Sequence, residues 1–225
     1  MIATDPESCF INWRNENVKA SRSISFSLCY EFVRKNQESR ALFICDRSTI
    51  ERDFPETATF ERSLSNHFLP VYLNKIDMKY VQDHFTLKKI LASLHLWLNP
   101  PGLIVISDLS LIIDPLRTMP RGDSAFMELT TNIIGLIDDL SRYFLREKGF
   151  RPRVVITDDE VKVAYTKLSR ALVPVMWELT LTTEEAILLT EHTGTEWAPS
   201  GRCDYFVRRG GGYIVDGIAE QESNA

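Results

Sequence analysis

The sequence predicts an α/β protein with a mainly parallel sheet, helices on both faces of the sheet and a C-terminal β-meander. Short, uniformly apolar segments alternate with longer segments in which apolar residues recur every three or four positions. The short segments are typical of strands buried on both faces, and the longer ones of amphipathic helices. Their alternation along the chain favours a parallel sheet covered by helices. Hydrophobic residues make up 44% of the 225 residues and charged residues 25%, which is ordinary for a globular domain with a full core.

The first third of the chain predicts a strand, a helix and a second strand. The strands are expected at Cys9–Trp13 and at residues 41–45, and the helix spans residues 21–35. The helix carries one broad apolar stripe, made of Ile24, Phe26, Leu28, Cys29, Phe32 and Val33. Residues 46–70 are polar and without a period, so we expect a long connection with one short helix. A further strand is predicted at residues 71–76.

The central third predicts two helices around the most hydrophobic strand of the chain. The first helix covers residues 86–98 and ends where two prolines follow, because proline cannot continue the helix. Its apolar face is formed by Leu87, Ile90, Leu91, Leu94 and Leu98. The strand is Leu103–Ile106, and the second and longest helix is Ser124–Lys148, with Gly149 as its C-cap.

The last third predicts one buried strand and then the meander. The buried strand covers residues 153–157 and ends at Asp158-Asp159. The meander strands are expected at residues 175–181, 186–190, 204–208 and 213–215. Glycines 210–212 join the last two strands, because glycine tolerates the positive φ of a hairpin turn. We see no repeat and no linker, and therefore expect residues 1–225 to form a single domain.

Charge and cysteine content narrow the class of protein. The net charge of −5 argues against a uniformly basic nucleic-acid coat but leaves room for a local basic loop. The four cysteines show no C-x-x-C pair, so Cys9, Cys29 and Cys45 are predicted to be buried free thiols rather than zinc ligands or disulfides. The sequence shows neither a signal peptide nor an apolar run of about 20 residues, so we expect an intracellular protein without a membrane segment.

The loop after the first strand lies where such sheets cradle phosphates, usually with the pattern G-x-x-x-x-G-K-[ST]. Residues 13–20 read W-R-N-E-N-V-K-A, in which only Lys19 matches. Trp13 and Val18 replace the two glycines, and Ala20 replaces the hydroxyl that holds Mg²⁺. A β-branched valine disfavours the backbone that a phosphate cradle needs. Lys19 is therefore either a relic of a nucleotide site or a surface lysine ahead of a helix.

Three aspartates are predicted at the ends of neighbouring strands: Asp46, Asp108 and Asp158. Asp108 has the form of an aspartate that holds Mg²⁺ beside a nucleotide, although any buried parallel strand ends in a polar residue. Ser21 is a candidate metal hydroxyl if the pattern shifts by one residue. Without a phosphate loop the aspartates have no nucleotide to act on. We therefore interpret Lys19 and Asp108 as a degenerate nucleotide site, with no catalytic residue and no metal site.

The order of these segments resembles the ATPase core of the eukaryotic RecA-family recombinase paralogues. The resemblance rests on residues 73–80 (LNKIDMKY) leading into LKKIL, on 102–113 (GLIVISDLSLII), on the long helix followed by RVVITDD, and on the closing hairpin DYFVRRGGGYIV. It covers residues 9–218. Within that family the chain is most similar to the small ATPase-like partner subunits of Shu-type recombination complexes, which pair with a SWIM-domain protein. It departs from the family in the phosphate loop, in the missing glutamate after the second strand and in Asp159, where a glutamine would be expected.

The resemblance implies a RecA-like domain without an N-terminal DNA-binding domain. It implies a pseudo-ATPase that holds no cofactor, any ATP being carried by the partner. The implied function is that of a nuclear, non-catalytic subunit in homologous-recombination repair. Such a subunit would pair with another RecA-family paralogue or a SWIM-domain protein and promote recombinase filament assembly and strand exchange on single-stranded DNA.

The resemblance also implies two loops that face DNA. The first is residues 114–123 with Arg117 and Arg121, and the second is residues 158–174 with Lys162 and Lys167. Arginines in a loop rich in proline and glycine suit phosphate contact, but they equally suit a solvated surface loop. The second segment also has the pattern of a packed helix.

Two other functions fit the same fold. A RecA-like ring subunit of an Elongator-type tRNA-modification complex can also lack the phosphate loop, and it would bind tRNA and two ring neighbours. A small active NTPase would instead bind and hydrolyse nucleotide. The short chain and the stretch at residues 73–80 favour recombination over the ring subunit.

Overall fold

A computed structural model of the chain describes residues 9–13, 18–52, 58–59, 70–116, 124–159, 175–183, 186–193, 198–209 and 212–220. The strands are β1 Cys9–Trp13, β2 Ala41–Asp46, β3 Ala58–Thr59, β4 Ile76–Val81, β5 Leu103–Ile106, β6 Arg153–Asp159, β7 Val175–Thr183, β8 Ala186–Thr193, β9 Ala198–Arg209 and β10 Gly212–Glu220. The helices are α1 Val18–Lys35, α2 Arg47–Arg52, α3 Pro70–Leu73, α4 His84–Ser93, the short 3-10 helix η2 Leu94–Leu96, α5 Leu109–Ile113 and α6 Ser124–Lys148.

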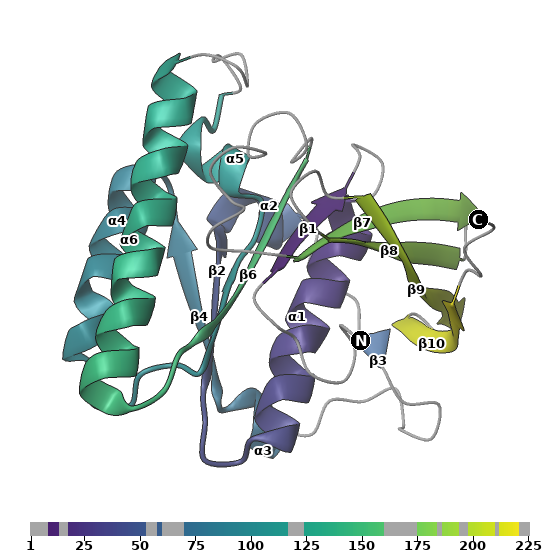
Figure 1. Cartoon of the computed structure of the whole chain (residues 1–225), viewed down its shortest axis with the longest axis horizontal. Helices are drawn as coiled ribbons and strands as arrows, with labels where there is room; N and C mark the ends of the chain where they lie inside the picture. Colours follow the sequence, from purple (N-terminus) through teal and green to yellow (C-terminus); the bar gives the residue numbers. More distant parts are fainter. Residues whose placement is uncertain are drawn as a thin grey trace.

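The strands form one sheet in the order β3-β10-β9-β8-β7-β1-β6-β5-β2-β4 (Figure 1). Neighbouring strands from β7 to β4 in this order run parallel, as expected for the uniformly apolar segments at β2, β5 and β6. In the middle of this part Ile106 of β5 lies opposite Ile44 of β2 and Ile156 of β6. All four residues of β5 are fully buried, so both faces of the sheet are covered there.

Helices cover the two faces of the parallel part, which confirms the predicted α/β class. Helix α1 packs on β1, β2, β5 and β6 and contacts α3, whereas α4, α5 and α6 pack on one another. Crossovers between parallel strands are right-handed, and the chain moves outward from β1 to β2 and β4 and then back to β5 and β6. The connections α1 and α3 therefore lie on one face, and α4, α5 and α6 lie on the other (Figure 1).

The C-terminal strands β7, β8, β9 and β10 are joined in sequence order by antiparallel pairing. This arrangement is the predicted meander, with strands longer than their sequence patterns indicated. The expected hairpin brings Arg209 opposite Gly212. The expected C-cap Gly149 has a φ of 74°, a conformation that glycine adopts without strain.

Two predictions about residues 70–98 are wrong. The strand expected at residues 71–76 is instead the short helix α3 followed by a turn, and the strand β4 begins only at Ile76. Pro70 opens α3, where its missing N–H costs nothing, and Tyr72 of α3 packs edge-on against Tyr30 of α1. Leu98 was expected on the inner face of a helix but is 92% exposed, because η2 ends at Leu96.

Candidate functional site

The predicted aspartates lie at the carboxyl edge of the parallel strands, the edge at which open α/β sheets bind their ligands. Asp46 is the last residue of β2, Asp108 comes two residues after β5, and Asp158 is near the end of β6. The backbone N–H of Ser107 donates to the carbonyl of Ile44 at 2.8 Å, which continues the pairing of β5 with β2 up to this edge. The strands therefore bring the three positions to one side of the sheet.

Asp108 has an unusual backbone conformation. Its φ of 57° and ψ of 56° place it in the left-handed region, and it is the sole non-glycine residue with positive φ in the described ranges. This conformation costs an L-residue about 1 kcal/mol, and aspartate tolerates it better than most. The backbone N–H of Asp108 donates to Oγ1 of Thr157 on β6 at 3.0 Å, and its carbonyl accepts from the N–H of Leu111 at 3.0 Å. These bonds fix the turn from β5 into α5.

The side chain of Asp108 forms a buried ion pair with Arg22 of α1. Nε of Arg22 donates to Oδ2 of Asp108 at 2.7 Å, and the two side chains are 1% and 2% exposed. The hydroxyl of Ser107 lies 3.2 Å from the same carboxylate oxygen. A charge taken out of water costs several kcal/mol unless it is paired, so the two groups depend on each other.

The other two aspartates have partners of their own. Asp158 is 1% exposed and accepts a hydrogen bond from the hydroxyl of Ser110, in the first turn of α5. Asp46 is half-buried and accepts from the hydroxyl of Ser48 at 2.5 Å. In the described part of the chain, no three His, Cys, Asp or Glu side chains are grouped so that they could hold a metal ion.

The charges of Asp108 and Arg22 also affect the pKa of Cys45 on β2. Burial raises the pKa of its thiol from the ordinary 9.0 to about 12, and the carboxylate of Asp108 adds to the rise while the guanidinium of Arg22 opposes it. The thiol is therefore protonated at neutral pH and is not a nucleophile. All four cysteines are buried and free, as predicted for Cys9, Cys29 and Cys45.

The loop that was interpreted as a degenerate phosphate loop lies largely outside the described residues, which omit 14–17. Helix α1 begins at Val18, three residues earlier than predicted, so Lys19 and Ala20 belong to its first turn. The side chain of Lys19 is outside the described part. Ser21, the alternative metal hydroxyl, is fully buried, and its Oγ makes no hydrogen bond to any described residue.

The candidate DNA-contacting side chains Arg117, Arg121, Lys162 and Lys167 also lie outside the described residues. The structure does describe where their segments start. Residues 114–116 follow α5, with Asp114 buried and Leu116 83% exposed, and residue 160 follows β6. The described parts of the chain that lead into both segments therefore end near the carboxyl edge, where Asp108 lies.

Sequence reasoning missed Arg22, although a signal for it was present. Arg22 lies four residues before Phe26, seven before Cys29 and eleven before Val33, which is the spacing of one helix face. A charged residue on a stripe that is otherwise apolar points to a buried partner of opposite charge.

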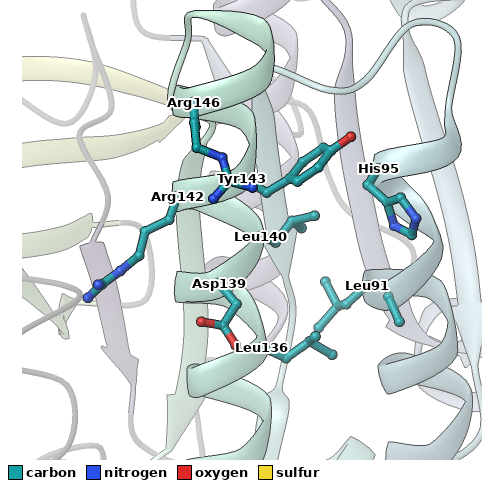
Figure 2. Close-up of a pocket in the computed structure, with 9 residues that line it drawn as sticks. Leu91, His95, Leu136, Asp139, Leu140, Arg142, Tyr143 and Arg146 are labelled. Atoms are coloured by element: carbon teal, nitrogen blue, oxygen red, sulfur yellow. The ribbon is translucent and has the colours of Figure 1, made fainter.

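Sequence reasoning also missed an apolar surface around β4 and α4. Large apolar side chains are exposed on β4 and in and beyond α4: Tyr80 by 48%, Phe85 by 70%, Leu96 by 75% and Leu98 by 92%. Nearby, a groove of about 550 Å³ separates α4 from α6. Figure 2 shows Leu91 and His95 on one side of it, facing Leu136, Leu140 and Tyr143 of α6 on the other. The ring of His95 meets that of Tyr143 edge-on, with centroids 5.7 Å apart.

No protein-family model matches this sequence, and no curated protein is significantly similar to it. Among the described helices, none is both long enough and apolar enough to cross a lipid bilayer.

Proposed function

We propose that this chain is a non-catalytic RecA-like subunit of a recombinase-paralogue complex. It pairs with another RecA-family paralogue or a SWIM-domain protein in the nucleus, and the pair promotes recombinase filament assembly on single-stranded DNA during homologous-recombination repair. The observation that carries the proposal is the buried ion pair between Arg22 and Asp108. It supports a site that does not turn over nucleotide.

Hydrolysis of a nucleotide needs Mg²⁺ to neutralise the charge that develops on the phosphates. In the RecA-like reading of this sheet, Asp108 is the residue that would hold that ion. Its carboxylate instead accepts from a guanidinium 2.7 Å away, and both side chains are almost fully buried. The residues present therefore do not fit a hydrated metal ion, and Trp13, Val18 and Ala20 do not fit a phosphate cradle.

The architecture is compatible with the RecA-like part of the proposal. Strand β1 lies inside the parallel part of the sheet and leads into α1, while β2 and β4 extend the sheet toward one edge. A long C-terminal meander extends it toward the other edge. Both features agree with the family resemblance of residues 9–218.

The exposed apolar side chains support a binding role. Exposed large apolar side chains are often used in protein interfaces. Tyr80 and Phe85 lie on β4 and at the start of α4, and Leu96 and Leu98 lie just beyond its end. We assign this surface, defined by Tyr80, Phe85, Leu96 and Leu98, to the paralogue partner.

The experiment is affinity capture of the endogenously tagged protein from cell extract, with the captured proteins identified by mass spectrometry. The proposal expects a RecA-family paralogue or a SWIM-domain protein in stoichiometric amount, together with recombinase. The variants Phe85→Asp and Leu98→Asp should lower partner capture by about tenfold or more, since each places a charge in the interface. Leu145→Asp is the matched control, because Leu145 is a 55% exposed leucine on α6. Capture of tRNA-modification ring subunits in place of recombination proteins would overturn the proposal.

A further inference from the structure

Arg22 is among the largest fully buried side chains of the described chain. Its position in the second turn of α1 and the packing of α1 on β5 bring its guanidinium to the carboxyl edge of the sheet. Burying an arginine is unfavourable unless an anion compensates it, and Asp108 is that anion. The pair therefore joins the helix that follows β1 to the turn that follows β5.

A divalent metal ion and this guanidinium compete for the same carboxylate. Mg²⁺ binds oxygen ligands at about 2.0–2.1 Å in near-octahedral geometry and keeps several of its waters. Oδ2 of Asp108 already has Nε of Arg22 at 2.7 Å and Oγ of Ser107 at 3.2 Å. A carboxylate that is 2% exposed leaves no space for a hydrated ion while the guanidinium stays in place.

We propose that Arg22 is a built-in counter-cation, whose guanidinium takes the place at Asp108 that a divalent metal ion takes in nucleotide-hydrolysing proteins of this architecture. The carboxyl edge is then neutralised from within the chain. Its conformation, including the left-handed turn at Asp108, does not depend on metal or nucleotide. This inference rests on the geometry of the ion pair and not on the identity of the partner.

The test is Mn²⁺ binding, followed by the loss of the free-ion electron paramagnetic resonance signal, on the purified full-length chain. Mn²⁺ uses the same oxygen ligands as Mg²⁺. Wild type should show no binding that Asp108→Asn removes. The variant Arg22→Gln should gain binding that the further change Asp108→Asn abolishes, because the carboxylate has lost its guanidinium. Asp108-dependent binding by wild type, or a folded Arg22→Gln variant that binds no Mn²⁺, would overturn the proposal.

Thermal unfolding of the same variants gives a second test, which does not depend on metal binding. Arg22→Gln and Asp108→Asn should each lower Tm by about 10 °C, because each leaves one buried charge without its counter-ion. The double variant should lose much less than the sum, since glutamine and asparagine are neutral and can bond to each other. Losses that simply add in the double variant would contradict the proposal.

The ion pair between Arg40 and Asp77 is the matched control. It has the same chemistry with two hydrogen bonds of 2.8 Å, but its side chains are 34% and 31% exposed. Exposed pairs contribute little, so Arg40→Gln and Asp77→Asn should each shift Tm by only about 2–4 °C.

Discussion

At the scale of single residues, burial decides what the charged and nucleophilic groups of this chain can do. Asp108 and Arg22 neutralise each other, and Asp158 is held by the hydroxyl of Ser110. Burial raises the pKa of the Cys29 thiol well above its usual range and that of Cys45 to about 12. At the carboxyl edge, Asp46, Asp108 and Asp158 therefore each accept a hydrogen bond from a neighbouring side chain.

The first prediction concerns the reactivity of the thiols. Only a thiolate attacks a disulfide reagent, and all four cysteines are buried, so native protein should react far more slowly with Ellman's reagent than unfolded protein. Cys45 should stay almost unreactive up to pH 9, because its thiolate fraction at pH 9 is only on the order of 10⁻³ given a pKa of about 12. Fast reaction of one thiol per native chain at pH 7, with a rate that levels off near pH 9 as for an exposed thiol, would contradict the buried position.

The raised pKa of Cys45 also makes the stability of the protein depend on pH. The folded pKa of Cys45 lies above its unfolded value, so the unfolded chain loses the proton first as the pH rises. The contribution of the protonated thiol is complete below about pH 9 and is lost as the pH rises toward 12. The stability difference between wild type and Cys45→Ala should therefore shrink over that range in urea titrations.

At the scale of elements, sequence periodicity predicted the buried elements well. Strands β1 and β5 and helix α6 have the predicted bounds, because a strand buried on both faces or a long amphipathic helix leaves a strong pattern. The exposed edge was predicted poorly. Strand β4 is the last strand of the sheet, so it is partly exposed and its sequence mixes polar and apolar residues. The apolar stretch Val71–Leu73, which forms the helix α3, resembled a buried strand more closely.

The candidate site was predicted only in part, because local sequence patterns do not show which distant residues pair. The strand ends at Asp46, Asp108 and Asp158 follow from the alternation of strands and helices. Arg22 could not be placed by periodicity alone, because an isolated arginine on a helix is usually solvated and its burial depends on a carboxylate 86 residues away in the chain. Long-range pairing of this kind is decided by tertiary packing rather than by local sequence.

A prediction at this scale tests the covering of the sheet on both faces. Ile104 of β5 is fully buried, so Ile104→Arg places an unpaired charge in the core and should cost at least about 4 kcal/mol. Circular dichroism and thermal unfolding should show an unfolded or strongly destabilised chain. Thr180→Arg, on an exposed position of β7, is the control and should change stability by less than about 1 kcal/mol. An Ile104→Arg chain that unfolds at the wild-type temperature would mean that this face of β5 is open.

At the scale of the whole molecule, two separate parts of the surface would serve the proposed function. The ion pair lies at this edge, and the segments with Arg117, Arg121, Lys162 and Lys167 start from it. The exposed Tyr80 lies on β4, the last strand at this end of the sheet, and the exposed Phe85, Leu96 and Leu98 lie within and beyond α4, which follows β4. This acidic protein, of net charge −5, would then contact DNA through a few local basic residues, while its partner covers the exposed apolar side chains.

The DNA prediction is tested on the assembled complex. If Arg117 and Arg121 contact phosphates, the variant with both changed to alanine should bind single-stranded DNA more weakly. The slope of log affinity against log salt should fall in magnitude by roughly one to two units, because fewer counterions are released. Partner capture should be unchanged. If slope and affinity both stay at the wild-type values, this loop is not part of the DNA-binding surface.

The central claim is that the chain serves recombination as a binding subunit and turns over no nucleotide. The most direct test is ATP turnover by the purified chain in the presence of Mg²⁺, measured by phosphate release. We predict no release above the protein-free rate, and no difference between wild type and Lys19→Ala, because the buried Arg22 holds the carboxylate that a metal ion would need. Steady ATP turnover that either Lys19→Ala or Asp108→Asn abolishes would contradict the account.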